Sequence, residues 1–283
     1  MKKLSLFIIA LVAFSCSKND NYTPPVNNSP TVDPKDLIVT TFLPTTNAIW
    51  WKYNTTNTMV IPAPAAGTSP TTNSDQLNVD SDVTVANIPY KLMKTTAAPT
   101  GFYSTMLNDN KLRVDGSSVK LTGDVSFNLG TNPISLNVTD LTIFKENAVA
   151  GATLSTPQSG SKLITPLGAS YSFDIKYIIK AVSNGDLASL VVGAQTYTNL
   201  KVVKIYVNID ATANLPGGIG AKPALDPQTQ DVIVSTQYWV KDLGVVFAET
   251  NVSYKLDVQI AAFAAQPIQN SRNVKDSLDS KSF

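Results

Sequence analysis

The strongest constraint on the fold of this chain is a run of alternating apolar and polar residues between Ala169 and Lys180. Five aromatic or aliphatic side chains, at every second position from Tyr171 to Ile179, fall on one face of an extended chain. The residues between them are polar, except for Ile178. This period of two is typical of a β-strand with one buried and one solvated face. At about 3.3 Å per residue the strand is about 40 Å long, which favours a large, curved sheet.

Shorter strand signals recur along the rest of the chain, each bounded by Gly, Pro, Asn or Asp. We expect further strands at residues 49–53, 59–61, 79–86, 90–94, 102–107, 111–114, 119–121, 125–129, 134–144, 200–209, 232–239, 245–249 and 254–263. A polar turn is expected at 54–57 and a loop at 62–74. Only residues 186–192 are compatible with one or two helical turns. The sequence therefore predicts an all-β protein, a large curved antiparallel sheet or half-barrel with little helix.

The first 16 residues have the layout of a secretory signal, with a basic start, an apolar run from Leu4 to Phe14 and a small residue before Cys16. An apolar run of about 11 residues is too short to cross a bilayer as a permanent helix. The small residue followed by the only cysteine of the chain resembles the lipobox of bacterial lipoproteins, which are cut before a lipid-modified cysteine. The resemblance implies that residues 1–15 are a signal peptide and that Cys16 carries the lipid. The alternative is an ordinary secretory signal with a cysteine near the cut.

The remaining chain divides by composition into three parts. Residues 16–36 hold four prolines among Asn, Ser, Thr and Asp, so they cannot bury enough apolar surface to offset the entropy of ordering them. We predict a flexible tether there, because the prolines keep the segment extended. An antiparallel β domain is expected at residues 37–265, followed by a polar, disordered tail at 266–283.

The residue inventory excludes several classes of enzyme. The chain has no histidine, and its one cysteine is the predicted lipidation site, Cys16. Ser-His-Asp and Cys-His nucleophiles need an imidazole base, and zinc sites draw on Cys or His. Carboxylate pairs are the remaining acid–base chemistry, but Asp80 and Asp82 are better interpreted as a solvated turn. We therefore expect a protein that is not an enzyme, with no catalytic residue, no cofactor and no metal, although the oxygens of residues 108–110 (NDN) leave calcium open.

Charge gives no indication of a nucleic-acid partner. Lys and Arg number 22 against 21 Asp and Glu, for a formal net charge of +1, whereas nucleic-acid binding needs a concentrated basic face. The expected partner is instead the membrane, reached through the lipid on Cys16.

Two stretches of the predicted β domain carry motifs in a characteristic order. Residues 42–44 (FLP) precede 50–53 (WWKY), and residues 194–200 (AQTYTNL) precede 237–246 (QYWVKDLGVV). These motifs resemble the opening and closing segments of Bacteroidota-type lipoproteins of unknown function, although the expected glycine at 47–49 is missing and Phe247 replaces a lysine. The resemblance implies an antiparallel half-barrel like that of lipoprotein carriers, whose concave side holds an apolar molecule. It supplies no functional residues.

The candidate ligand-binding residues are aromatic. Trp51 and Tyr53 share one face of a strand while Trp50 takes the other, so an outward ring is available to stack on a sugar and an inward ring to pack in the core. Trp239, next to Tyr238, offers the same two alternatives.

These observations predict a lipoprotein anchored in the outer membrane, whose non-enzymatic β domain binds a hydrophobic or extended ligand. The alternatives are a surface glycan-binding lipoprotein of a polysaccharide-uptake system, and a hydrolase that uses two aspartates. Residues 18–20 (KND) partly match the export signal of surface lipoproteins, which leaves the periplasmic and the external side both open.

Growth of the producing cells with labelled palmitate tests the lipid anchor. We expect the label to enter the wild-type protein but not the Cys16→Ala variant, because the thiol is the site of attachment, and we expect the variant to leave the membrane fraction. Absence of label from the wild type, with both forms fractionating alike, would contradict the prediction.

Overall fold

A computed structural model describes residues 41–63, 68–129, 132–165, 170–264 and 266–283. The predicted signal peptide, Cys16 and the tether lie outside these residues. The described strands are β1 (Trp50–Ile61), β2 (Thr71–Val85), β3 (Ile88–Thr95), β4 (Lys111–Asp115), β5 (Ser118–Leu129), β6 (Asn132–Lys145), β7 (Gln158–Ile164), β8 (Ser172–Val192), β9 (Gln195–Leu215), β10 (Gly220–Pro223), β11 (Thr229–Val240), β12 (Gly244–Lys255) and β13 (Gln269–Lys281). The helices are α1 (Phe102–Leu107) and α2 (Val258–Phe263).

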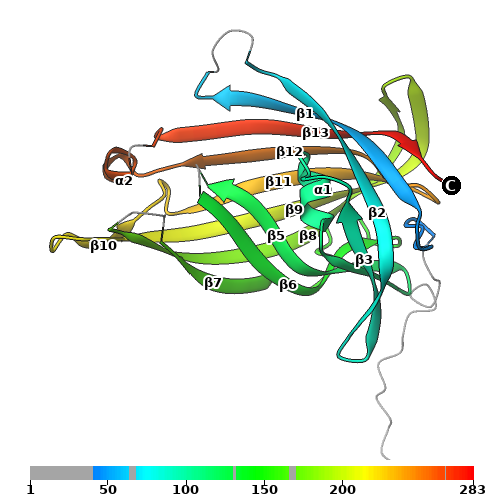
Figure 1. The fold of residues 1–283 in the computed structure, drawn as a ribbon, viewed down its shortest axis with the longest axis horizontal. Helices are drawn as coiled ribbons and strands as arrows, with labels where there is room; N and C mark the ends of the chain where they lie inside the picture. Colours follow the sequence, from blue (N-terminus) through cyan, green and yellow to red (C-terminus); the bar gives the residue numbers. More distant parts are fainter. Residues whose placement is uncertain (1–40, 64–67, 130–131, 166–169, 265) are drawn as a thin grey trace, which may run out of the picture. The chain divides into compact units, whose positions relative to one another are not determined.

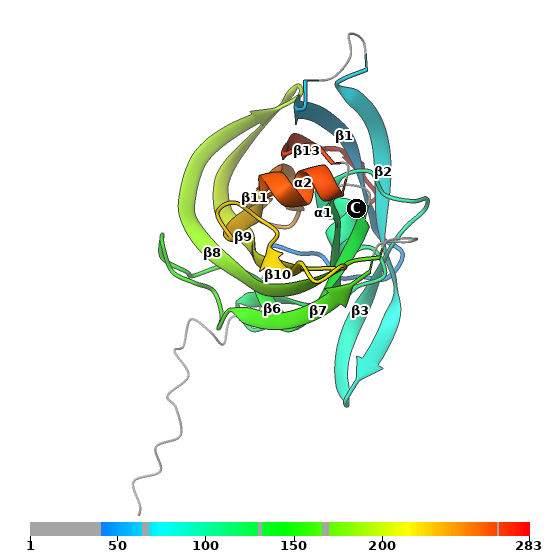
Figure 2. The same cartoon turned by 90° about the vertical axis from the view of Figure 1, so that its left-hand side faces the viewer.

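All these strands belong to one antiparallel sheet. Its order is β6-β5-β4-β3-β2-β1-β13-β12-β11-β9-β8-β7, and the short β10 pairs with β9. The sheet curls until the two edge strands, β6 and β7, lie side by side (Figures 1 and 2). The predicted all-β, curved antiparallel sheet is confirmed, and it curls beyond a half-barrel into a nearly closed barrel.

Side chains, rather than a backbone ladder, join the two edge strands. The Gln158 side chain on β7 accepts a hydrogen bond from the backbone N–H of Thr139 on β6 at 2.8 Å, and it donates one to the carbonyl of the same residue. The Lys162 ammonium donates to the carbonyl of Ser135 at 2.9 Å. Backbone groups at a sheet edge otherwise invite pairing with another chain, so these bonds protect the edge of β6.

A third bond crosses the same seam from β8. The hydroxyl of Tyr177 donates to the carbonyl of Asn137 on β6 at 3.1 Å. It passes over Gly160 on β7, where a Cβ atom would lie only 2.4 Å from the tyrosine oxygen. A glycine at this position is therefore required by the close approach of the side chain.

The strand predicted from residue 169 to 180 corresponds to the first part of β8, which begins at Ser172 and continues to Val192. Residues 186–192, compatible with helical turns in the sequence, pair with residues 195–201 of β9 instead. A bulge between Ser183 and Gly185 shifts the register, so the alternation changes phase and loses its clear period of two.

The predicted turn at 54–57 is wrong, because β1 runs unbroken from Trp50 to Ile61. The strand pairs with β2 on one side and with β13 on the other. Its polar residues are placed by this pairing; the amide of Asn54, for example, bonds to Asp279 at 3.1 Å. Two flanking ladders outweigh a local composition that favours a turn. The predicted loop at 62–74 is likewise too long, since β2 begins at Thr71.

The prediction of a disordered tail at 266–283 is also wrong. Residues 269–281 form β13, which lies between β1 and β12 and pairs with both. The β domain therefore extends beyond residue 265. The inner face of β13 carries Arg272 and Asp276 besides the buried Val274, which explains why its sequence does not have the apolar alternation of a core strand.

Two short helices occupy places where strands were predicted. Helix α1 contacts β2, β3, β5 and β13, and five of its six residues are buried. The helix has only six residues, four of them apolar, and so short a segment does not separate helix from strand by its spacing. Helix α2 lies across one end of the curled sheet (Figure 2), with Ile260 and Ala261 buried and its start capped by the Asp257 side chain. Within the described ranges, no helix has the length and apolar character needed to cross a membrane.

Candidate functional site

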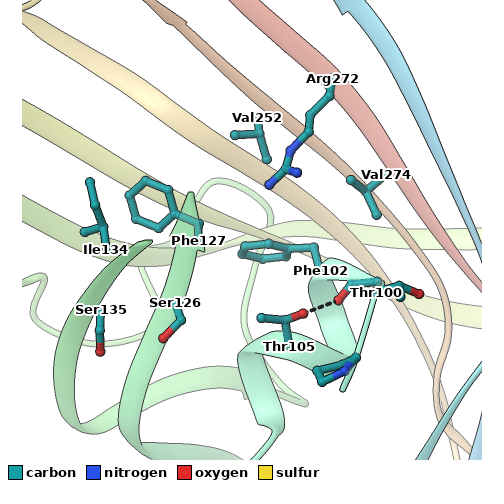
Figure 3. A pocket seen from close by; sticks show the side chains of 12 residues that line it. Thr100, Phe102, Thr105, Ser126, Phe127, Ile134, Ser135, Val252, Arg272 and Val274 are labelled. Carbon is teal, nitrogen blue, oxygen red and sulfur yellow. Dashed lines mark hydrogen bonds between the residues drawn. The ribbon is translucent and has the colours of Figure 1, made fainter. Parts of the chain in front are cut away.

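A cavity of about 430 Å³ lies between α1, the β5–β6 hairpin and strands β12 and β13 (Figure 3). Its lining is mixed. Five apolar side chains in it are buried: Phe102, Phe127, Ile134, Val252 and Val274. The polar members are Thr100, Thr105, Ser126, Ser135 and Arg272. Protein interiors contain few voids larger than a water molecule, whereas sites for small molecules are apolar hollows of this volume. The cavity is therefore the candidate ligand site.

The cavity adjoins a second, polar hollow of about 400 Å³, here called the vestibule. The two share Pro99, Thr105 and Ser126 in their linings. The vestibule is otherwise lined by Asn108, Asp109, Asn110 and Asp124, of which the two aspartates are exposed to solvent. The vestibule thus combines solvent-exposed polar residues with a boundary that it shares with the cavity.

The vestibule exists because β4 is much shorter than β5. Strand β5 pairs with β4 only from Ser118 to Thr122. Beyond Thr122, the backbone of β5 bonds to a side chain in place of a neighbouring strand. The Asn110 side chain donates to the carbonyl of Asp124 at 2.7 Å and accepts from the N–H of Asp124 at 2.8 Å. Beyond this point the β4 side of β5 faces α1 and the two hollows.

Among the described residues, Arg272 is the only charged side chain in the cavity lining. It projects from the inner face of β13, opposite Val252 on β12, toward the aromatic rings of α1 and β5 (Figure 3). Within the part of the chain that the structure describes, its guanidinium has neither an ion pair nor a hydrogen bond. Burial lowers the pKa of Arg272, and the nearby Tyr254 opposes that shift. The group nevertheless remains a cation at any physiological pH.

Arg113, the other arginine of the chain, shows how this protein satisfies such a group internally. Its guanidinium makes two hydrogen bonds to Asp140, at 3.0 and 2.7 Å, and an ion pair with Asp115 at 3.0 Å. The bond from Arg113 is the main reason why the pKa of Asp140 falls to about 2. Arg272 has the same five donors and meets none of these partners.

Two buried aspartates hold the wall of the cavity that includes Thr100 and Phe102. The Asp75 carboxylate accepts from the Thr100 N–H at 3.0 Å and from the Gly101 N–H at 2.8 Å. Asp276 accepts from the Tyr103 N–H at 3.1 Å, while its second oxygen is buried without a partner among the described residues. The carboxyl lies so close to Gly101 that a Cβ there would be 1.6 Å from the free oxygen. Both aspartates thus fix the start of α1.

This pair of carboxyls does not form a catalytic cleft. Neither aspartate lines the cavity, and both Asp75 oxygens are already bonded to the backbone. Burial raises the pKa of Asp276 to about 7, with the hydrogen bond from Tyr103 opposing this shift and the charge of Asp75 adding to it. The geometry accounts for the pair as a support for α1.

The aromatic residues singled out in the sequence lie elsewhere. Trp51 and Tyr53 share the inner face of β1 at 1% exposure each, and Trp239 on β11 is fully buried, whereas Trp50 is half-buried on the outer face. The predicted faces are therefore confirmed. The Trp51 indole N–H donates to the carbonyl of Leu243 at 2.6 Å. None of the four residues lines the cavity, and the three inward rings belong to the packed core.

Residues 108–110, which left calcium open, form a turn between α1 and β4 rather than a hairpin. The Asn108 side-chain oxygen accepts from both the N–H and the hydroxyl of Thr95, at 2.9 Å each. Across the described ranges, no three Cys, Asp or Glu side chains gather as metal ligands do. The turn joins α1 to β4, and its Asn110 side chain bonds to the backbone of β5.

The cavity residues were accessible to sequence reasoning in part only. Phe127 and Ile134 fall in predicted strands, and the period of two places them inward. Arg272 carried no such signal, because it lies in a segment whose composition predicts disorder. Its role depends on the strands on either side of it.

Comparisons with protein family models, curated proteins and solved structures give no match to this chain. The resemblance of its end motifs to Bacteroidota-type lipoproteins stays a prediction.

The protonation of Asp276 predicts a pH-dependent stability. An unfolded aspartate loses its proton near pH 4, whereas folded Asp276 keeps it to about pH 7. Between these values the folded state binds more protons, so the free energy of unfolding falls as pH rises through this window. We expect the Asp276→Asn variant to lose this decline and to gain stability relative to the wild type on going from pH 4.5 to 7.5, as measured by urea unfolding.

Asp279→Asn is the matched control, because Asp279 is exposed on the same strand. It is expected to follow the pH profile of the wild type. Parallel profiles for the wild type and Asp276→Asn would refute the assignment of a proton to the buried carboxyl.

Proposed function

We propose that this protein is a lipoprotein, anchored in the outer membrane through Cys16, whose β domain holds an apolar ligand in the cavity beside α1. The observation that carries the proposal is the cavity of about 430 Å³ with five buried apolar side chains in its wall. Apolar space of this size is what a hydrophobic ligand fills. The vestibule supplies a route for it from solvent.

The chemistry of the lining favours binding over catalysis. The hydroxyls of Thr105 and Ser126 have no histidine to activate them, since the chain has none, and no carboxylate lines the cavity. A hydroxyl without a base is a weak nucleophile, and arginine does not exchange protons near neutral pH. We therefore propose a carrier or receptor rather than an enzyme.

The membrane anchor rests on the sequence of residues 1–16. A lipoprotein cysteine bears more than one acyl chain, and stable anchoring takes at least two such signals. The proline-rich residues 16–36 would then set the β domain apart from the bilayer.

The glycan-binding alternative has less support. A sugar stacks on an exposed aromatic face, and of the four aromatic candidates only Trp50 is on the outer surface, where it is half-buried. The cavity is the better-defined site, so the apolar ligand remains our proposal.

A neutral fluorescent probe, N-phenyl-1-naphthylamine, tests ligand binding, because its emission rises in apolar surroundings. The full chain carrying Cys16→Ala is the background, since it has no lipid of its own to compete for the cavity. We expect saturable binding. We also expect at least tenfold weaker binding when Ser126→Trp fills the boundary between cavity and vestibule.

Thr84→Trp is the control, because Thr84 is an exposed strand residue of β2 that lines neither hollow. It is expected to bind the probe as the background does. An absence of saturable binding, or equal affinity in all three forms, would count against the proposed function.

A further inference from the structure

Arg272 gives the cavity a preference that its apolar walls alone would not. We infer that the cavity selects a single-chain amphiphile with an oxyanion head, which binds the Arg272 guanidinium while its aliphatic tail packs among the apolar side chains around it. This inference rests on the proposed function and adds to it the chemical class of the ligand.

The first support is the unsatisfied hydrogen-bonding capacity of the guanidinium. A half-buried donor without a partner is unfavourable, and guanidinium groups in proteins are usually matched to carboxylate or phosphate oxygens. Arg113 follows that rule within this chain, with Asp140 and Asp115. Arg272 departs from it where its side chain lines the cavity, so the oxygen atoms of a ligand can supply the missing hydrogen-bond acceptors.

The acid on the same face of β13 does not neutralise Arg272. Asp276 lies two inward-facing positions further along the strand, but it is fully buried and accepts its hydrogen bond from the start of α1. No ion pair joins it to Arg272. Asp276 therefore binds the start of α1, whereas Arg272 lines the cavity.

The second support is the combination of charge and apolar surface in one wall. Figure 3 shows Arg272 beside Val252, with the rings of Phe102 and Phe127 facing the end of its side chain. An ion such as acetate or phosphate would leave these rings without a partner, and a neutral hydrocarbon would leave the guanidinium without one. An amphiphile satisfies both, because a planar oxyanion can accept two parallel hydrogen bonds from arginine.

The vestibule contributes no positive charge, so a preference for anions must come from Arg272. The charged residues of the vestibule are Asp109 and Asp124, and no lysine or arginine among the described residues lines it. A general positive field therefore does not explain anion binding here. Removal of the single charge at position 272 should remove the preference.

Titration calorimetry with dodecanoate and with 1-dodecanol, below their aggregation concentrations, tests the inference on the full chain carrying Cys16→Ala. We expect the affinity for dodecanoate to exceed that for dodecanol by about tenfold or more. Arg272→Gln, which keeps a polar side chain but removes the charge, should lower dodecanoate affinity about tenfold or more and leave dodecanol affinity unchanged. Retained dodecanol binding shows that the variant is folded with its cavity intact.

Arg272→Lys and Lys275→Gln are the two further variants. Arg272→Lys keeps the charge but loses the planar fork, so an intermediate dodecanoate affinity is expected. Lys275→Gln makes the same change in net charge as Arg272→Gln at an exposed position of the same strand, and it should bind dodecanoate as the background does.

The outcomes separate this inference from the proposed function. Equal affinity for dodecanoate and dodecanol, unaffected by Arg272→Gln, would overturn the inference and leave the apolar site standing. Acetate binding as tightly as dodecanoate would show a simple anion site and would also overturn it. Binding of neither long-chain probe would overturn both.

Discussion

A sheet of this size has two edges, and the way this protein protects them determines its interior. The sheet curls until β6 meets β7, and three side chains, Gln158, Lys162 and Tyr177, bond to the backbone of β6 in place of a ladder. The width of a barrel grows with the number of its strands. Inward-facing side chains alone do not fill a barrel this wide, so α1 packs inside it and α2 crosses one end. The cavity is the space that remains beside α1.

Buried polar groups on the inner faces of β2 and β13 position that helix. Asp75 and Asp276 bind the backbone at the start of α1, and α1 in turn forms a wall of the cavity. Arg272 lies on the same inner face of β13 and reaches the cavity itself. One polar strand thus both holds the helix and supplies the cation. Such groups weaken a core unless each is satisfied. Arg272 faces the cavity, whereas Asp276 is buried against α1 with one of its oxygens unpartnered among the described residues.

Sequence reasoning predicted the parts of the fold in which local pattern and final environment agree. The alternation at 169–180 identifies β8 because one of its faces is buried and the other is exposed. The opposite faces of Trp50 and Trp51 follow from the same period. The strands expected at 232–239 and 245–249 likewise correspond to β11 and β12, which pair as a hairpin.

The remainder depends on contacts between distant segments. The polar residues of β1 and β13 resemble turns and tails, yet the two strands pair with each other across more than 200 residues of sequence, as Trp51 and Lys281 show. Residues 102–107 are too few for a period to indicate a helix. The cavity residues differ in the same way. The local pattern predicts that Phe127 faces inward, whereas the position of Arg272 in the cavity depends on its neighbours on β12 and α1.

We propose that an amphiphilic anion occupies the cavity in the cell. Native mass spectrometry of the protein released from its own membranes tests this most directly. One non-covalent anionic amphiphile per chain is expected in the wild type, and its loss is expected in Arg272→Gln. A wild-type chain with no such adduct, or an adduct retained equally by the variant, would contradict it.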